Sequence, residues 1–209
     1  MAHDDPDHAL NEEELSLIEF QSPGRFKIDN PELQSALPEE RSAAPFLLGV
    51  STEAQAFNDM GEARQHALAL IQQVRRSLTI YTPDLEPWLY NHSSIQKACS
   101  RFLLSHPRNR LRILVSDSTR AVKEGHRLVT LSRRLTSNFF VRKVHPDYPV
   151  NASTFLVADE CGMLIRPNAE QYSGHALYRD PVRARQQLRL FDAAWDRSLT
   201  DPDMRSFLL

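Results

Sequence analysis

Residues 77–83, SLTIYTP, decide the fold class of this chain. The apolar and β-branched run predicts a buried strand, and Pro83 ends it. Apolar residues at helical spacing predict one helix over 60–76, before this strand, and another over 93–106, after it. Residues 111–116, LRILVS, are the next predicted strand. Because strands alternate with helices, the sequence predicts an α/β domain.

The pattern continues towards both ends of the chain. The sequence predicts a helix over 124–135, a strand over 139–144, a hairpin of residues 154–158 and 163–165 around residues 159–162, and a last helix from Pro181. A further short strand is expected at the apolar run 46–50. One hairpin among strands that alternate with helices predicts a single mixed sheet with helices on both faces.

Charge divides the chain into two parts. Residues 1–60 carry 3 basic and 13 acidic side chains, a formal charge of −10, whereas residues 61–209 carry 22 basic and 14 acidic ones, a formal charge of +8. Residues 1–44 have few large apolar side chains and four prolines, so we expect a flexible acidic arm before a folded domain over 45–209. Within that arm, Leu15–Phe20 is apolar enough to bind the domain or a protein partner, and the arm could mask a basic face.

Several classes of protein are disfavoured by what the sequence lacks. No apolar run reaches the roughly 18 residues of a membrane span, no secretory signal is apparent, and two cysteines cannot form a disulfide framework. We therefore expect a cytoplasmic protein that does not enter the membrane. The eight histidines are scattered, and the phosphate-binding loop and dinucleotide fingerprint are missing, so neither a metal nor a cofactor is expected.

Two strand motifs and the hairpin carry a family resemblance. Residues 80–83 (IYTP), 112–115 (RILV) and the hairpin 154–166 (TFLVADECGMLIR) occur in an order that resembles one unit of the phospholipase D-like superfamily. That resemblance implies a catalytic H-x-K-x4-D motif whose aspartate would be Asp159. The histidine and lysine would then stand at 152 and 154, where this chain has Ala152 and Thr154. The resemblance also places Asn168 in this degenerate site.

The missing motif residues predict a pseudoenzyme. In the family the histidine attacks phosphorus and the lysine stabilises the phosphoryl oxygens, which alanine and threonine cannot do. The chain also resembles an uncharacterised bacterial domain that accompanies acetyltransferase domains. It has no acetyl-CoA-binding loop, so acetyl transfer is not expected of it.

Basic side chains then become the main functional signal. Residues 61–147 hold 15 Lys or Arg against 6 Asp or Glu. Guanidinium groups suit phosphate contacts, so we predict that the chain binds RNA or DNA. The candidate anion-binding residues, most of them on the 124–135 helix, are His126, Arg127, Arg133, Arg134, Arg142 and Lys143, and the candidates for stacking on bases are Trp88 and Tyr90.

Two other functions are compatible with the sequence. The domain could be a protein-interaction adaptor, and because phospholipase D-like units pair, that adaptor could be a homodimer. Alternatively, Asp117 follows a predicted central strand, where sites of α/β proteins tend to lie, and with His126 it could form an unrecognised hydrolase or transferase site.

Overall fold

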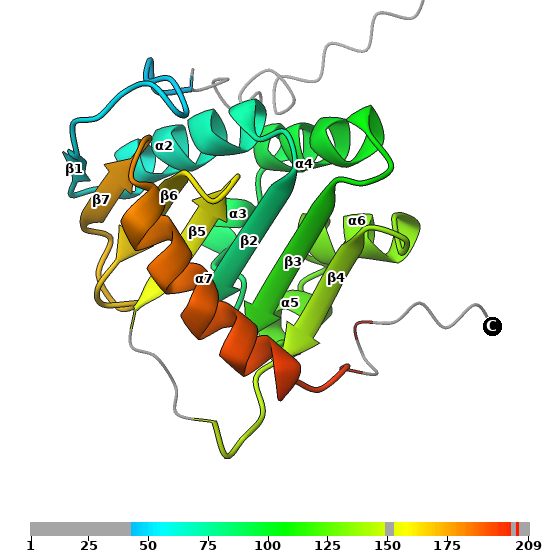
Figure 1. Ribbon diagram of the computed structural model, residues 1–209. Coiled ribbons are helices and arrows are strands. Elements are labelled where there is room, and N and C mark those ends of the chain that lie inside the picture. The colour runs from blue at the N-terminus through cyan, green and yellow to red at the C-terminus, as the bar shows by residue number, and fades with distance from the viewer. Residues whose placement is uncertain (1–42, 149–152, 202–203, 205–209) are drawn as a thin grey trace, which may run out of the picture. The chain divides into compact units, whose positions relative to one another are not determined.

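A mixed β-sheet organises the part of the chain that the computed structural model describes, which is residues 43–148, 153–201 and 204. Across these residues the sheet has seven strands in the order β1-β7-β6-β5-β2-β3-β4 (Figure 1). The strands are β1 (Gln55–Phe57), β2 (Ser77–Thr82), β3 (Arg110–Val115), β4 (Phe139–Lys143), β5 (Thr154–Ala158), β6 (Gly162–Arg166) and β7 (Gly174–Leu177).

Strand β2 lies where the direction of the sheet changes. It pairs in parallel with β3, which pairs in parallel with β4. On its other side β2 is antiparallel to β5, with Tyr81 opposite Phe155, and β5, β6, β7 and β1 continue antiparallel. The carboxyl end of β2 therefore lies beside the start of β5 and the end of β6.

Helices cover both faces of the sheet, as the sequence predicted (Figure 1). One face carries α2 (Met60–Gln73), α3 (Pro87–Tyr90), α4 (Ser93–Ser105), α5 (Thr119–Lys123) and α6 (Arg127–Arg134), and the other carries α7 (Pro181–Asp196). Alternate residues of β2 divide between the two cores: Ile80 packs beneath α2 and α4, whereas Tyr81 packs beneath α7. The period-2 alternation of strand side chains thus produces two apolar layers.

Most predicted elements are present, and the differences have local causes. The expected 124–135 helix begins only at Arg127, because Gly125 has a φ of +65° and separates α5 from α6. Residues 46–50 do not form a strand: residues 48–50 form a turn, and Phe46 packs on the core. Strands β1 and β7 were not predicted, since they have only three and four residues and little alternation.

Two predictions fall outside the described residues. The acidic arm up to residue 42, including Leu15–Phe20, is one, and Ala152 is the other. Both stay predictions from the sequence.

Candidate functional site

The ends of three strands meet at the position that the family resemblance assigns to catalysis. Thr154 begins β5 and lies opposite Arg166, the last residue of β6. Thr82 ends β2, the neighbour of β5 on the other side. All three side chains are buried, with exposed fractions of 3% or less. The described part of this site is therefore a buried polar cluster.

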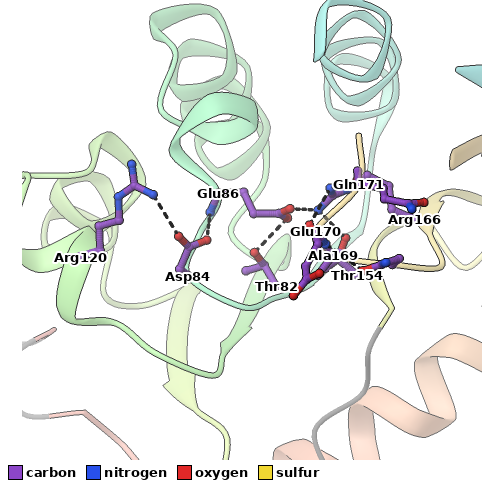
Figure 2. A network of polar contacts seen from close by, with 10 residues as sticks. Thr82, Asp84, Glu86, Arg120, Thr154, Arg166, Ala169, Glu170 and Gln171 are labelled. Carbon is purple, nitrogen blue, oxygen red and sulfur yellow. Dashed lines mark hydrogen bonds and ion pairs between the residues drawn. The ribbon is translucent and has the colours of Figure 1, made fainter. Parts of the chain in front are cut away.

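Arg166 is the centre of this cluster (Figure 2). Its Nη2 donates a hydrogen bond of 3.0 Å to Thr154 Oγ1 and forms an ion pair with Glu86. Its Nη1 donates to the carbonyl oxygens of Ala169 and Gln171, at 3.2 and 2.6 Å. Burial lowers the pKa of Arg166 to about 10, so the guanidinium stays charged at neutral pH. The position where the resemblance places the family's lysine therefore carries a neutral hydroxyl that accepts a hydrogen bond from a neighbouring cation.

Glu86 reaches Arg166 from a strained loop after β2. Leu85 and Glu86 have φ values of 65° and 35°, in the left-handed region that non-glycine residues rarely adopt. Asp84 Oδ1 accepts from the N–H of Glu86 at 2.9 Å, and the Thr82 hydroxyl donates to Glu86 Oε2 at 3.0 Å. Such strain, on the order of 1–3 kcal/mol per residue, persists only when surrounding contacts impose it. These bonds hold the carboxylate where it neutralises Arg166.

Aromatic side chains cover the cluster. The guanidinium carbon of Arg166 lies 4.9 Å from the ring centroid of Trp88, and Tyr172 packs edge-on against Trp88 at 4.9 Å. Trp88, a predicted stacking residue, is thus half-buried against an internal cation. Tyr90, the other one, is only 2% exposed, so stacking on a base is ruled out for it in this structure.

The two charged groups and the two threonine hydroxyls of the cluster already have partners within it. The cation and carboxylate neutralise each other, and both threonine hydroxyls have partners within the cluster. A buried, internally bonded set of groups cannot attack a phosphodiester in solvent. Among the described residues of the cluster, no nucleophile is exposed to solvent.

Asp159 lies at the opposite end of β5 from Thr154. Its Oδ1 accepts from the N–H groups of Arg76 and Ser77 at 2.7 and 3.0 Å, and its Oδ2 accepts from that of Arg75 at 2.7 Å. With a φ of 51° it occupies the hairpin turn between β5 and β6. The carboxylate therefore joins this turn to the start of β2, and it does not face Thr154.

The remaining motif position, Asn168, is exposed in the loop after β6. Its Oδ1 accepts from the N–H of Glu170 at 2.9 Å, and its carbonyl oxygen accepts from the N–H of Gln171 at 3.2 Å. Asn168 therefore shapes the turn that presents the Ala169 and Gln171 carbonyls to Arg166.

His126 does not lie on the basic surface, so the prediction that it binds an anion is wrong. The side chain is fully buried and caps α6 by accepting, through Nδ1, the N–H of Leu128 at 3.1 Å. Burial lowers the pKa of His126 to about 4, which keeps it neutral at pH 7. Asp117 is exposed, and its carboxylate accepts from both the N–H and the hydroxyl of Thr119. These contacts give each residue a local structural role instead of a shared catalytic one.

The other basic candidates do not lie together on one surface. Arg134 ends α6 at the loop that leads to β4, whereas Arg127 begins the helix, roughly 10 Å away along its axis. Arg133 and Arg142 both line a cavity of about 760 Å³ beside the outer strand β4. Arg142 also stacks on Trp195 at 4.6 Å. Lys143 is half-buried, and its main chain pairs with Leu199.

A second group of arginines gathers at the starts of the parallel strands. Arg75 and Arg76 precede β2, Arg108 precedes β3 and Arg110 begins it, and Arg134 precedes β4 through a short loop. We call these five residues the arginine rim. All five side chains are exposed. Of the five, only Arg134 was among the sequence candidates. Basic residues at the starts of successive parallel strands are a signal that could have identified the other four, Arg75, Arg76, Arg108 and Arg110.

The described residues contain neither a candidate metal site nor a helix that could span a membrane. They contain no group of three or more His, Cys, Asp or Glu side chains placed to hold a metal ion. None of the helices in the same part of the chain has the length and apolarity to cross a membrane.

Comparison with solved structures shows that the fold is phospholipase D-like. The chain is similar to the phospholipase D family member Nuc from Salmonella typhimurium, with a TM-score of 0.52 and 15% identity, over 74% of this chain and 99% of Nuc. It is similar to NucT from Helicobacter pylori, with a TM-score of 0.54 and 11% identity, over 71% of this chain and 99% of NucT.

A third similar structure is described as a DNA-binding protein. This is TrmBL2, an archaeal chromatin protein, with a TM-score of 0.54 and 10% identity, over 81% of this chain and 59% of TrmBL2. At these identities the likeness concerns the fold. No curated protein matches the chain.

One family model covers most of the folded part. It matches residues 59–207, which run from the cap of α2 past the last described residue, and so includes β2, the buried Arg166 cluster and every member of the arginine rim. The chain therefore belongs to the family described as "Domain of unknown function (DUF7931)".

Proposed function

We propose that this protein is a non-catalytic phospholipase D-like module that binds nucleic acid through exposed arginines. The observation that carries the proposal is the hydrogen bond from Arg166 to Thr154, with Glu86 as the counter-ion. A phosphodiesterase of this fold needs a cation that is free to stabilise the phosphoryl oxygens. Here the buried cation is already neutralised by a buried carboxylate.

Surface charge supports a role in binding polyanions. The segment 61–209 has a formal charge of +8, and several of its arginines have exposed side chains that are free of ion pairs within the described residues. Examples are Arg75, Arg76, Arg127 and Arg134. Since guanidinium groups bind phosphate oxygens in a bidentate manner and release counter-ions from nucleic acid, such residues supply affinity without sequence preference.

The structural neighbours support the same proposal at the level of the fold. TrmBL2 is described as an archaeal chromatin protein with a novel mode of DNA binding. A fold of this kind is therefore compatible with a protein that binds DNA.

The proposal is tested on the full-length chain with two assays. Fluorescence anisotropy with a labelled 20-base-pair duplex should show binding at about 50 mM salt that weakens steeply by about 200 mM. Hydrolysis of bis(p-nitrophenyl) phosphate, with and without divalent cations, should stay at the buffer rate. Absence of binding at about 50 mM salt, or turnover that is lost in an Arg166 variant, would contradict the proposal.

A further inference from the structure

The arginine rim is assembled by the pairing of parallel strands. The N–H of Arg110 donates to the carbonyl oxygen of Arg76 at 3.0 Å, so the loops before β2 and β3 lie side by side. The N–H of Leu111 donates to the carbonyl oxygen of Asn138 at 2.9 Å, which brings in the loop after α6. Parallel strands start at the same edge of the sheet, and Figure 1 shows the three loops at that edge.

The guanidinium groups of the rim are available to a ligand. Within the described residues, the side chains of Arg75, Arg76, Arg108 and Arg134 are exposed and form neither ion pairs nor hydrogen bonds. Arg110 donates only to main-chain carbonyls, those of Pro107 and Asn109, at 2.9 and 3.2 Å. Some arginines outside the rim are paired, such as Arg112 with Asp192 at 2.8 Å and Arg120 with Glu124 at 3.0 Å. Others, such as Arg127, form no ion pair within the described residues, so what distinguishes the rim is that its arginines gather at one edge of the sheet.

Two acidic residues of the β5–β6 turn lie near the rim without cancelling it. The Asp159 carboxylate accepts from the N–H groups of residues 75–77. Glu160 is exposed, and no ion pair joins it to an arginine within the described part of the chain. Five arginines against these two carboxylates leave the edge positive.

The rim is also remote from the buried Arg166 cluster. The arginines stand at the starts of β2, β3 and β4, whereas Thr82 and Arg166 stand at the ends of β2 and β6. A ligand on the rim therefore does not depend on the site that the fold family uses for catalysis.

We propose that the arginine rim binds the phosphate backbone of double-stranded nucleic acid. This inference rests on the proposed function and names the surface and the form of the ligand. Three adjacent strands place the outer loops about 10 Å apart, which is close to the roughly 12 Å width of the major groove between two phosphate strands.

Duplex is favoured over single strands because the rim lacks a stacking platform. Binding to single strands normally uses exposed aromatic rings on which bases stack. Among the described residues, the exposed large apolar side chains include one aromatic, Tyr172, and it packs on Trp88 at the far edge of the sheet. Because no exposed aromatic ring accompanies the five arginines, we expect them to contact phosphates and not bases.

The test compares two variants of the full-length chain with equal loss of charge. The rim variant carries Arg75→Gln, Arg76→Gln, Arg108→Gln and Arg134→Gln. The control carries Arg179→Gln, Arg185→Gln, Arg189→Gln and Arg197→Gln, four exposed arginines on or beside α7. Anisotropy with a labelled 20-base-pair duplex should show at least a tenfold loss for the rim variant near 100 mM salt and less than threefold for the control.

Salt dependence identifies the contacts as phosphate contacts. Each lost phosphate contact reduces the magnitude of the slope of log K against log salt by about 0.9, so the rim variant, which lacks four contacts, should lose about 3.6. A variant with lysine at the same four positions should keep most of the affinity, and circular dichroism melts should place all variants near the unmodified chain.

Three outcomes overturn this inference and leave the proposed function standing, whereas a fourth overturns the proposed function itself. Equal weakening in the rim and control variants overturns the rim while nucleic-acid binding stands. So does a larger loss in an Arg133→Gln, Arg142→Gln variant of the cavity beside β4. Tighter binding of a 20-nucleotide single strand than of the duplex overturns the form of the ligand, and no binding by the unmodified chain overturns the proposed function itself.

Discussion

Thr154 and Arg166 face each other as a register pair of β5 and β6, and the hydroxyl of the first accepts a 3.0 Å hydrogen bond from the guanidinium of the second. This pair occupies the position where the family resemblance would place a lysine. Its cation is held by Glu86 instead of by a substrate phosphate.

Glu86→Gln should destabilise the fold strongly, because it leaves the buried Arg166 charge without a counter-ion. Breaking a buried pair from one side costs about 3–5 kcal/mol of unfolding free energy. Urea denaturation followed by circular dichroism measures the change. The control is Arg120→Gln, which removes exposed ion pairs with Glu124 and Asp84 and should destabilise the fold far less, because solvent screens exposed charges. Equal losses in the two variants would show that the buried pair has no special role.

Restoring the family's motif should not restore catalysis. Ala152→His with Thr154→Lys would bring a second cation against Arg166, so we expect a less stable protein that does not hydrolyse bis(p-nitrophenyl) phosphate. Adding Arg166→Gly removes the competing cation and should recover part of the stability, since the new lysine can then pair with Glu86. Hydrolysis by the chain with two substitutions, at a rate above the buffer, would show that the cluster does not block the site.

Asp159→Ala should destabilise the protein by about 2–4 kcal/mol, because three main-chain N–H groups lose a charged acceptor. Asp159→Asn keeps an acceptor and tolerates the left-handed backbone, so its loss should be smaller. Thermal melts compare the two. Duplex binding by the asparagine variant should be equal to or tighter than that of the unmodified chain, because a carboxylate beside Arg75 is gone. Weaker binding would assign Asp159 to the ligand.

His126 should make stability depend on pH between about 6.5 and 4. Its pKa is about 4 in the fold, where burial opposes protonation, although Asp84 and Glu124 favour it and Arg127 opposes it. The unfolded chain, with a histidine pKa near 6.5, binds the proton first as the pH falls. Stability is therefore lost on acidification, by about 2 kcal/mol between pH 7 and pH 5 from this residue.

The variant His126→Asn isolates that contribution. Asparagine can cap α6 as the histidine does, and it does not titrate. Urea unfolding at pH 7 and pH 5 should show a smaller loss in the variant than in the unmodified chain. His66, whose pKa burial also lowers, is present in both proteins and cancels in the comparison. An identical pH dependence would show that His126 is protonated equally in the folded and unfolded chains.

The buried polar cluster was beyond prediction because its members are far apart in the chain. Thr154 was identified from the motif spacing, but Glu86 and Arg166 carry no local pattern that marks them as partners. Their pairing depends on a left-handed loop after β2 and on the antiparallel registers of β2, β5 and β6. Similarly, the residues next to His126 in the sequence do not distinguish it from a surface histidine, and only the packing around it shows that it is buried.

The α/β class and the limits of β2 and β5 were predictable from the sequence, because periodicity and prolines act locally. Residue identity alone shows that Ala152 and Thr154 stand where the resemblance places the motif histidine and lysine. Which charged side chains lie close together depends on the tertiary structure. It joined Arg166 to Glu86 in the interior, where low polarity makes pairing obligatory. It also gathered Arg75, Arg76, Arg108, Arg110 and Arg134 at one edge, where solvent lets like charges coexist. Distances between charges depend on strand pairing, and strand pairing cannot be predicted from any single segment of the sequence.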